Sequence, residues 1–318
     1  MIHVAVLDDY QQVGREMADW SSLGPDVQVE FLAQPLGGTD TAAAALAGFD
    51  VICLMRERQP MPAGLIRRLP RLKLIVVTGA HNRTLDLEAA DAAGICVCHT
   101  RGGESLHATT ELAWALILAA LRHVPLEDRW MRQGLWQGTV GRTLYGRRLG
   151  LLGLGRLGAR MAEVAKVFGL DVVAWSKNLT QARCDELGAR LVDRDTLFRQ
   201  SDIISLHLVL SERTQGIVGA TELALMRPDA ILVNTSRGPL VDEAALVRAL
   251  QARQIAAAGL DVYDIEPLPA DHPLRRLDNA VLSPHLGYVT EGTYRMFFAD
   301  MVENIAAWRQ GTPLRVLA

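Results

Sequence analysis

The 318-residue sequence has little of several features that would set it apart from ordinary globular proteins. It has only four cysteines, all in apolar or helical contexts, which favours a cytoplasmic location. It has no run of about 18 uncharged apolar residues, and residues 1–9 read as a strand, so neither a membrane span nor a signal peptide is expected. Acidic and basic residues nearly balance, 36 against 33, for a net charge of −3. Nucleic acid is therefore a poor candidate for a partner.

Two of the cysteines, Cys96 and Cys98, stand two positions apart on an expected strand, so both thiols point to one face. Such a pair could belong to a metal or redox site. A metal site usually needs further ligands at suitable spacing, however, and none is evident. We interpret the two cysteines as small strand residues and expect no metal.

Glycine occurs in a particular arrangement near the middle of the chain. Gly153, Gly155 and Gly158 stand in a Gly-Leu-Gly-Arg-Leu-Gly motif that follows the apolar run 149–152 and precedes the amphipathic stretch 159–168. A strand, a glycine turn and a helix in this order present backbone N–H groups to a pyrophosphate. The first glycine allows the tight turn, the second lets phosphates approach the backbone, and the third lets the helix pack closely on the strand. The motif predicts a dinucleotide site.

Strand and helix patterns alternate in both halves of the chain, which predicts mostly parallel sheets covered by helices. The expected strands are 4–7, 27–32, 51–55, 72–78 and 95–98 in the first half, and 149–152, 172–175, 189–191, 203–206, 230–234, 256–260 and 281–283 in the second. A chain of this length suggests about two domains. We expect an α/β fold made of two Rossmann-like, doubly wound parallel-sheet domains with an active-site cleft between them.

The domain boundaries follow from two helical patterns. The apolar stretch 106–121 is expected to be a helix that runs between the domains, and the tail 292–309 is expected to be a helix that returns to the first domain. Residues 1–100 plus 288–318 would then form a flavodoxin-like substrate-binding domain, and residues 101–287 the dinucleotide-binding domain.

The segment 124–148 has large apolar residues among basic ones and no clear period. It has too many large apolar groups for a solvated loop. Either it wraps its own domain, or it is an arm that packs on another subunit.

Three titratable residues each follow a strand of the second series: Arg237, Glu266 and His285. In open α/β sheets, ligands bind outside the carboxyl ends of the strands, so we expect these side chains near the glycine turn. An arginine binds a carboxylate or a carbonyl oxygen, and a histidine transfers protons near neutral pH. A glutamate bonded to that histidine would favour the imidazolium form and keep a proton available for an alkoxide formed by hydride attack.

With these residues in place, the chain resembles the D-isomer-specific 2-hydroxyacid dehydrogenase family. The matching stretches are 153–158, 234–238, 261–267 and 283–287, together with 78–82 and 308–313, so the resemblance runs over essentially the whole chain. It implies an oxidoreductase that transfers a hydride between NAD(P)H and a small 2-oxo acid or D-2-hydroxy acid. It also implies a homodimer built partly from the arm 124–148.

The resemblance implies roles for individual residues. Arg237 would hold the substrate's carboxylate and keto oxygen, His285 would be the acid/base, and Glu266 would orient His285. Main-chain groups around Gly79 and Ala80 would bind the substrate carboxylate. The remaining residues implied at the cofactor are Arg156 and Leu157 at the pyrophosphate, Thr235, Ser236 and Asp261 at the nicotinamide and its ribose, and His207 and Gly287 in neighbouring loops.

One departure bears on the choice of cofactor. An acidic residue that binds the adenine ribose is expected about 20 residues beyond the glycine turn. Here the strand 172–175 is followed by Ser176 and Lys177 instead. A hydroxyl and a positive charge favour a 2′-phosphate, so we expect NADP(H) to be preferred over NAD(H). The alternative is that Lys177 points into solvent and the enzyme binds NAD weakly.

Arg56, Glu57 and Arg58 follow the strand 51–55. They are either a solvated charge cluster or place one arginine against an anionic substrate, and Arg56 is the better candidate because it directly follows the strand. We expect a glyoxylate/hydroxypyruvate reductase-like enzyme. The alternatives are a phosphoglycerate dehydrogenase-like enzyme and a dinucleotide-sensing protein of the corepressor type, which shares this fold.

Overall fold

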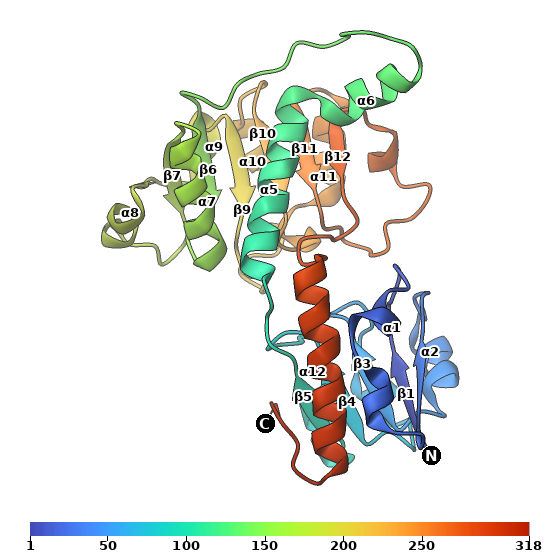
Figure 1. Ribbon diagram of the computed structural model, residues 1–318. Coiled ribbons are helices and arrows are strands. Elements are labelled where there is room, and N and C mark those ends of the chain that lie inside the picture. Colours follow the sequence, from blue (N-terminus) through green and yellow to red (C-terminus); the bar gives the residue numbers. More distant parts are fainter. Residues whose placement is uncertain (318) are drawn as a thin grey trace. The chain divides into compact units, whose positions relative to one another are not determined.

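The computed structural model describes residues 1–317, which divide into two compact units (Figure 1). Unit 1 consists of Met1–Glu104 and the chain from Thr290 onward, and unit 2 is Ser105–Val289. The chain thus leaves unit 1 after residue 104 and returns to it at residue 290. The sequence had placed these crossings after residues 100 and 287.

Unit 1 is built on a five-stranded sheet in which every neighbouring pair is parallel, in the order β2-β1-β3-β4-β5. Its strands are β1 (Ile2–Val6), β2 (Val27–Phe31), β3 (Val51–Leu54), β4 (Leu74–Val77) and β5 (Cys96–His99). All residues of β3 and β4 are buried, as expected of central parallel strands with helices on both faces.

The helices of unit 1 are mostly short. They are α1 (Gly14–Met17), α2 (Thr39–Leu46), α3 (Ala63–Ile66) and α4 (Leu87–Ala92), with a 3-10 turn at Trp20–Leu23. The exception is α12 (Glu291–Arg309), which begins at the N-cap Thr290 and packs against β4, β5 and α1 (Figure 1). Phe297, Phe298 and Met301 bury one face of this helix completely. The C-terminal helix is therefore an integral part of unit 1.

Unit 2 contains a seven-stranded sheet, also parallel throughout, in the order β12-β11-β10-β9-β6-β7-β8. Its strands are β6 (Arg148–Leu152), β7 (Asp171–Trp175), β8 (Arg190–Leu191), β9 (Ile203–Leu206), β10 (Ile231–Asn234), β11 (Ala257–Leu260) and β12 (Ala280–Leu282). The order reverses between β6 and β9. Such a switch point, at the carboxyl ends of the strands, is where doubly wound sheets bind ligands.

The helices of unit 2 cover both faces of this sheet. They are α5 (Ser105–Arg122), α6 (Val124–Arg132), α7 (Arg156–Val167), α8 (Gln181–Leu187), α9 (Arg194–Gln200), α10 (Ala220–Leu225) and α11 (Glu243–Gln251), with 3-10 turns at Gly238–Leu240 and Pro273–Arg276. The expectation that the long helix at 106–121 runs between the domains is wrong. Helix α5 belongs to unit 2, where it packs on β10, β11 and α7 and buries Ala113, Trp114 and Ile117 (Figure 1).

Helix α6 lies in the segment for which the sequence showed no clear period, and none of its residues is buried. The chain that follows passes over one end of unit 2 before it enters β6 (Figure 1). Trp136 is 74% exposed and Val140 is 91% exposed. Leu144 of the same segment is buried in the core of unit 2, so the segment packs on its own unit at this point and leaves Trp136 and Val140 exposed. No helix within residues 1–317 combines the length and apolar character needed to cross a bilayer.

Candidate active site

The glycine turn joins β6 to α7 at the centre of the unit 2 sheet. Gly153 has a φ of +105°, and a Cβ there would lie 2.6 Å from the His207 carbonyl oxygen. A Cβ at Gly158 would lie only 2.2 Å from the Gly153 carbonyl oxygen. At Gly155, the N-cap of α7, a Cβ would meet nothing within 4 Å. Two glycines thus permit close packing, and the third leaves open space at a helix N-terminus, which is the arrangement that admits a phosphate.

The first turn of α7 contains the other two residues predicted at the pyrophosphate. Arg156 is exposed and Leu157 is half-buried. Along the neighbouring strand β7, Ser176 and Lys177 follow the last residue, with Ser176 half-buried and Lys177 exposed. The Gly153 N–H donates to the carbonyl oxygen of Trp175, the last residue of β7, at 2.9 Å, so the chain enters Ser176 and Lys177 next to the glycine turn.

Buried polar atoms without partners follow β9 and β10. Within residues 1–317, His207 Nδ1 and Thr235 Oγ1 are buried and have no hydrogen-bond partner. His207 Nε2 is bonded to Ser205 Oγ at 2.9 Å, and burial lowers the pKa of His207 to about 4, so the ring is neutral at pH 7. Ser236 differs, because its hydroxyl donates to the Leu206 carbonyl oxygen at 2.7 Å. These two atoms follow the neighbouring strands β9 and β10, and they fit a dinucleotide that would supply hydrogen bonds there.

The strongest contact among the predicted catalytic residues joins His285 and Glu266. Nδ1 of His285 lies 2.5 Å from Oε2 of Glu266, and the two side chains are 21% and 31% exposed. The main-chain N–H of Tyr263 donates to the other carboxylate oxygen, Oε1, at 3.0 Å. Burial acts to raise the pKa of Glu266, but the hydrogen bond from His285 and the charges of His285 and Arg237 outweigh it, so this pKa lies below its usual value. An ionised Glu266 stabilises an imidazolium at His285.

Arg237 lies on the loop after β10, close enough to Glu266 for its charge to lower the pKa of that carboxyl. Its Nη1 donates to the Ser236 carbonyl oxygen at 2.7 Å. The Asn234 side chain fixes the turn, because it donates to the Arg237 carbonyl oxygen and accepts from the Ser236 N–H. The next residue, Gly238, packs so tightly on the following loop that a Cβ there would lie 2.1 Å from the carbonyl group of Tyr263. The loop that carries Arg237 and the loop that carries Glu266 are therefore in close contact.

Asp261 was predicted to lie near the nicotinamide and its ribose, but in the structure its carboxylate is bonded to the protein itself. Its carboxylate is 1% exposed and accepts three hydrogen bonds from the protein itself: from Ser283 Oγ at 2.6 Å, from Leu286 N at 2.7 Å and from Gly287 N at 2.9 Å. Burial raises the pKa of Asp261 above its usual value in spite of these bonds. The visible role of Asp261 is to hold the turn that carries His285. Its contact with the nicotinamide ribose, and that of Gly287 with the cofactor loop, stay predictions.

Sequence reasoning missed Tyr263. Its side chain is buried, and its hydroxyl donates to the Ser283 carbonyl oxygen at 2.9 Å, two residues before His285. His285 has a φ of +56°, so its turn is conformationally demanding. Tyr263 thus fixes Glu266 through its main chain and the His285 turn through its side chain. The only sequence signal was its place within the stretch 261–267.

The predicted substrate ligands lie together in unit 1, at the ends of β3 and β4. Arg56 has a φ of +54°; its N–H donates to Thr78 Oγ1 at 2.7 Å and its Nη1 to the Thr78 carbonyl oxygen at 2.9 Å. Gly79 has a φ of +77°, and a Cβ there would lie 1.9 Å from Arg56 Nη1. Ala80 is exposed. Arg56 therefore lies directly against the loop that was predicted to bind a carboxylate.

No group of three His, Cys, Asp or Glu side chains within residues 1–317 could hold a metal ion. Cys96 and Cys98 do face each other, with their Sγ atoms 3.8 Å apart, and burial raises the pKa of Cys98 to about 12. All four cysteines are free.

Comparison with known proteins agrees with this geometry. Residues 114–287 match the model of the D-isomer specific 2-hydroxyacid dehydrogenase NAD binding domain. A glyoxylate reductase from Aeropyrum pernix is 41% identical over 256 residues, which are 78% of this chain and 76% of that protein. A D-3-phosphoglycerate dehydrogenase from Archaeoglobus fulgidus is 36% identical over 264 residues, and the chain spans 50% of its length.

Solved structures agree as well. A phosphoglycerate oxidoreductase from Vibrio cholerae O395 superposes with a TM-score of 0.91 at 36% identity, covering 98% of this chain and all of that one. The two parallel sheets, the glycine turn and these matches lead to one conclusion. The chain belongs to the D-isomer specific 2-hydroxyacid dehydrogenase family and is an oxidoreductase that uses a nicotinamide dinucleotide.

Proposed function

We propose that the chain reduces a small 2-oxo acid, glyoxylate or hydroxypyruvate, to the corresponding 2-hydroxy acid. The observation that carries this proposal is the 2.5 Å contact between His285 and Glu266, with the charge of Arg237 acting on the same carboxylate. An acid, the carboxylate that stabilises its protonated form and a fixed cation are what carbonyl reduction requires.

A nicotinamide dinucleotide bound at the glycine turn would supply the hydride for C2 of the 2-oxo acid. Arg237 binds the substrate's carboxylate and keto oxygen through its planar guanidinium and stabilises the charge that develops on that oxygen. His285, whose Nδ1 is bonded to Glu266, gives the proton on Nε2 to the same oxygen. One C–H bond and one O–H bond form as the carbonyl double bond becomes single, so the product is the neutral alcohol.

NADP(H) is the preferred cofactor in this proposal. Ser176 and Lys177 follow β7, where an acidic residue would repel a 2′-phosphate. An exposed lysine can approach that phosphate as a point charge. Gly153, Gly155, Arg156, Leu157 and Gly158 bind the pyrophosphate.

Unit 2 is then the dinucleotide-binding domain and unit 1 the substrate-binding domain. Arg56, Gly79 and Ala80 bind the substrate carboxylate. Support comes from the conformation of Arg56, since a non-glycine residue at positive φ held by several hydrogen bonds often marks a functional position.

The working enzyme is a homodimer in the cytoplasm. The segment 124–148 is the contact arm, because Leu135, Trp136, Val140 and Tyr145 are all more than half exposed. Exposed apolar groups of this size are typical of a protein interface. The four free thiols fit a reducing compartment.

A second candidate is oxidation of D-3-phosphoglycerate, favoured by the relatives that carry this name at 34–36% identity. The two activities require the same catalytic groups and differ in the size and charge of the substrate.

One panel of assays tests these proposals. Reduction of glyoxylate and hydroxypyruvate is measured with NADPH and with NADH, and oxidation of D-3-phosphoglycerate with the oxidised forms. The proposal expects the highest kcat/KM for a small 2-oxo acid with NADPH. A Lys177→Ala variant should lose most of the NADPH preference, whereas Lys166→Ala, on the far part of α7, should not. No turnover of any 2-oxo acid would refute the main proposal, and a clear preference for NADH would refute the choice of cofactor.

A further inference from the structure

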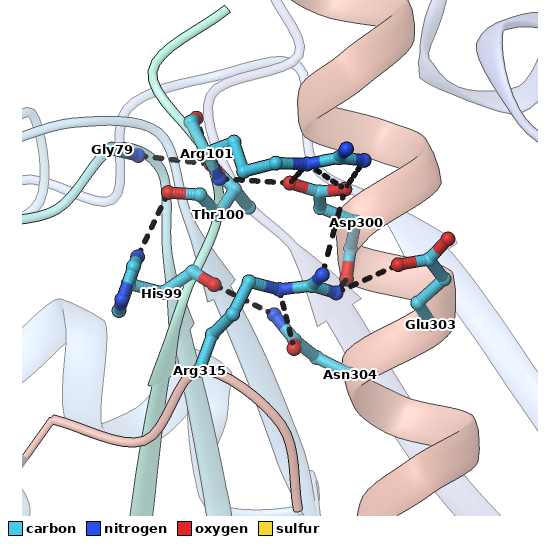
Figure 2. Close-up of polar contacts among 8 residues, drawn as sticks. All are labelled: Gly79, His99, Thr100, Arg101, Asp300, Glu303, Asn304 and Arg315. Atoms are coloured by element: carbon cyan, nitrogen blue, oxygen red, sulfur yellow. Dashed lines mark hydrogen bonds and ion pairs between the residues drawn. The ribbon is translucent and has the colours of Figure 1, made fainter.

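A polar network in unit 1 joins the end of β5 to α12 (Figure 2). Its centre is Asp300, which is completely buried. Arg101 lies 199 residues away in the sequence and donates to this carboxylate with its main-chain N–H at 2.8 Å and with Nη2 at 2.6 Å. Burial acts to raise the pKa of Asp300, but the bonds from Arg101 hold it below its usual value. The carboxylate is therefore ionised and holds both the main chain and the side chain of Arg101. We call this Arg101–Asp300 pair the clamp.

A second arginine reinforces the clamp from the C-terminal segment. Arg315 donates from Nη2 to the Asp300 carbonyl oxygen at 3.3 Å and to Glu303 at 3.0 Å, and from Nε to Asn304 at 3.1 Å (Figure 2). Asn304 in turn donates to the His99 carbonyl oxygen at 3.0 Å. Residues on both sides of Thr100 are thus tied to α12.

Thr100 connects this network to a loop of the proposed substrate site. Thr100 is completely buried, and its Oγ1 accepts the Gly79 N–H at 2.9 Å (Figure 2). The same hydroxyl donates to the Arg101 carbonyl oxygen at 3.0 Å, which fixes the direction of its proton. The Thr100 N–H is bonded to the Val77 carbonyl oxygen and continues the ladder between β4 and β5. The hydroxyl therefore has one partner on the clamp and one on the Gly79 loop.

We propose that Thr100 is a positioning residue for substrate binding: its hydroxyl, held in place by the Arg101–Asp300 pair, orients the Gly79–Ala80 backbone that binds the substrate carboxylate. This inference rests on the proposed function of that backbone. Gly79 is at positive φ and has no side chain that could hold it, so a hydrogen bond from its own N–H is an effective way to fix its peptide plane. A loop fixed before the substrate arrives does not lose conformational freedom on binding.

The direct test is Thr100→Val, which keeps the shape of the side chain and removes the hydroxyl. The Gly79 N–H then loses its acceptor, and the loop must move to find another. We expect KM for glyoxylate to rise roughly tenfold, the equivalent of one hydrogen bond, with kcat changed less than about twofold. The affinity for NADPH should not change. Thr100→Ser, which keeps the hydroxyl, should restore a KM close to that of the wild type.

A matched control removes another buried threonine hydroxyl. Thr110 lies in unit 2, is 3% exposed and donates to the Leu106 carbonyl oxygen at 2.7 Å. Thr110→Val removes a buried hydroxyl outside the proposed substrate site and should leave KM unchanged. A purely structural role for Thr100 predicts no change in KM for either valine variant, so an unchanged KM in folded Thr100→Val would overturn the inference.

A second variant keeps the inference testable if Thr100→Val does not fold. Asp300→Asn retains an acceptor for the Arg101 N–H and removes the charge that holds the guanidinium. It should raise KM for glyoxylate a few-fold, again with little change in kcat, and an unchanged KM would contradict the role of the clamp. Failure of the proposed function looks different, because then the wild-type protein itself would not reduce glyoxylate.

Discussion

Replacing Glu266 by glutamine should separate the charge of this residue from its shape. In the structure Glu266 Oε1 accepts the Tyr263 N–H at 3.0 Å, and Oε2 lies 2.5 Å from His285 Nδ1. A glutamine that keeps its oxygen toward Tyr263 must turn its NH₂ group toward His285. Nδ1 then has to accept, so the imidazolium loses its partner and meets a donor. The opposite orientation sets two N–H groups against each other at Tyr263.

The magnitude follows from the kind of hydrogen bond that is lost. A bond to a charged group contributes about 1.5–3 kcal/mol, and the partial exposure of both side chains places this one near the lower end. The expected loss in kcat/KM for 2-oxo acid reduction is therefore about 10- to 30-fold.

The assay is kcat/KM for glyoxylate from pH 5.5 to 9 at saturating cofactor. Glu163→Gln is a suitable control, since Glu163 forms an exposed ion pair with Arg160 on α7 and touches none of the proposed catalytic residues. A Glu266→Gln enzyme with the wild-type kcat/KM across this range would refute the idea that the charge of this carboxylate contributes to proton transfer.

Three further predictions concern the packing around the site. Gly158→Ala places a Cβ 2.2 Å from the Gly153 carbonyl oxygen and should lower the free energy of unfolding by about 1–3 kcal/mol. Gly155→Ala has free space around its Cβ, so it should weaken cofactor binding without changing the melting temperature. Equal melting temperatures for the two variants would contradict this prediction. Tyr263→Phe removes the donor to the Ser283 carbonyl oxygen and should lower kcat about three- to tenfold without affecting cofactor affinity; an unchanged kcat would contradict this. The pKa of His207 is about 4 in the folded protein and 6.5 in the unfolded chain, so the unfolded state binds this proton first as the pH falls. Urea unfolding should therefore show a loss of up to about 2 kcal/mol in the free energy of unfolding between pH 7 and pH 5. His207→Gln should lose less stability over the same range.

The fold could be predicted well from the sequence because its pattern is local. Buried parallel strands such as β3, β4, β9 and β10 are short apolar runs bounded by polar residues, and each expected strand has a counterpart in the structure. Helix α6 was not predicted because the segment 124–148 as a whole shows no clear period, although this nine-residue helix is itself amphipathic; its apolar side chains are not buried in unit 2. The position of α5 could not be predicted because an apolar helical pattern indicates that a helix is buried but not in which unit.

The sequence could place the candidate catalytic residues after the ends of strands, but it could not show their contacts. The topology explains why Glu266 and His285 meet, since both follow neighbouring strands, β11 and β12, of one parallel sheet. Sequence could not show that Tyr263 holds both loops, because its two contacts depend on side-chain direction. The bond between Arg101 and Asp300 spans 199 residues, and no short-range pattern reports such a pair.

The central claim is that His285 transfers the proton while the bound cofactor supplies the hydride. His285→Asn tests it most directly, because asparagine tolerates the positive φ of this position, +56°, but cannot act as the acid. The measurement is kcat for glyoxylate reduction together with the dissociation constant of NADPH for the wild type and the variant. The account predicts a kcat at least about a hundredfold lower with the dissociation constant unchanged within about twofold. A His285→Asn variant that turns over at the wild-type rate would contradict it.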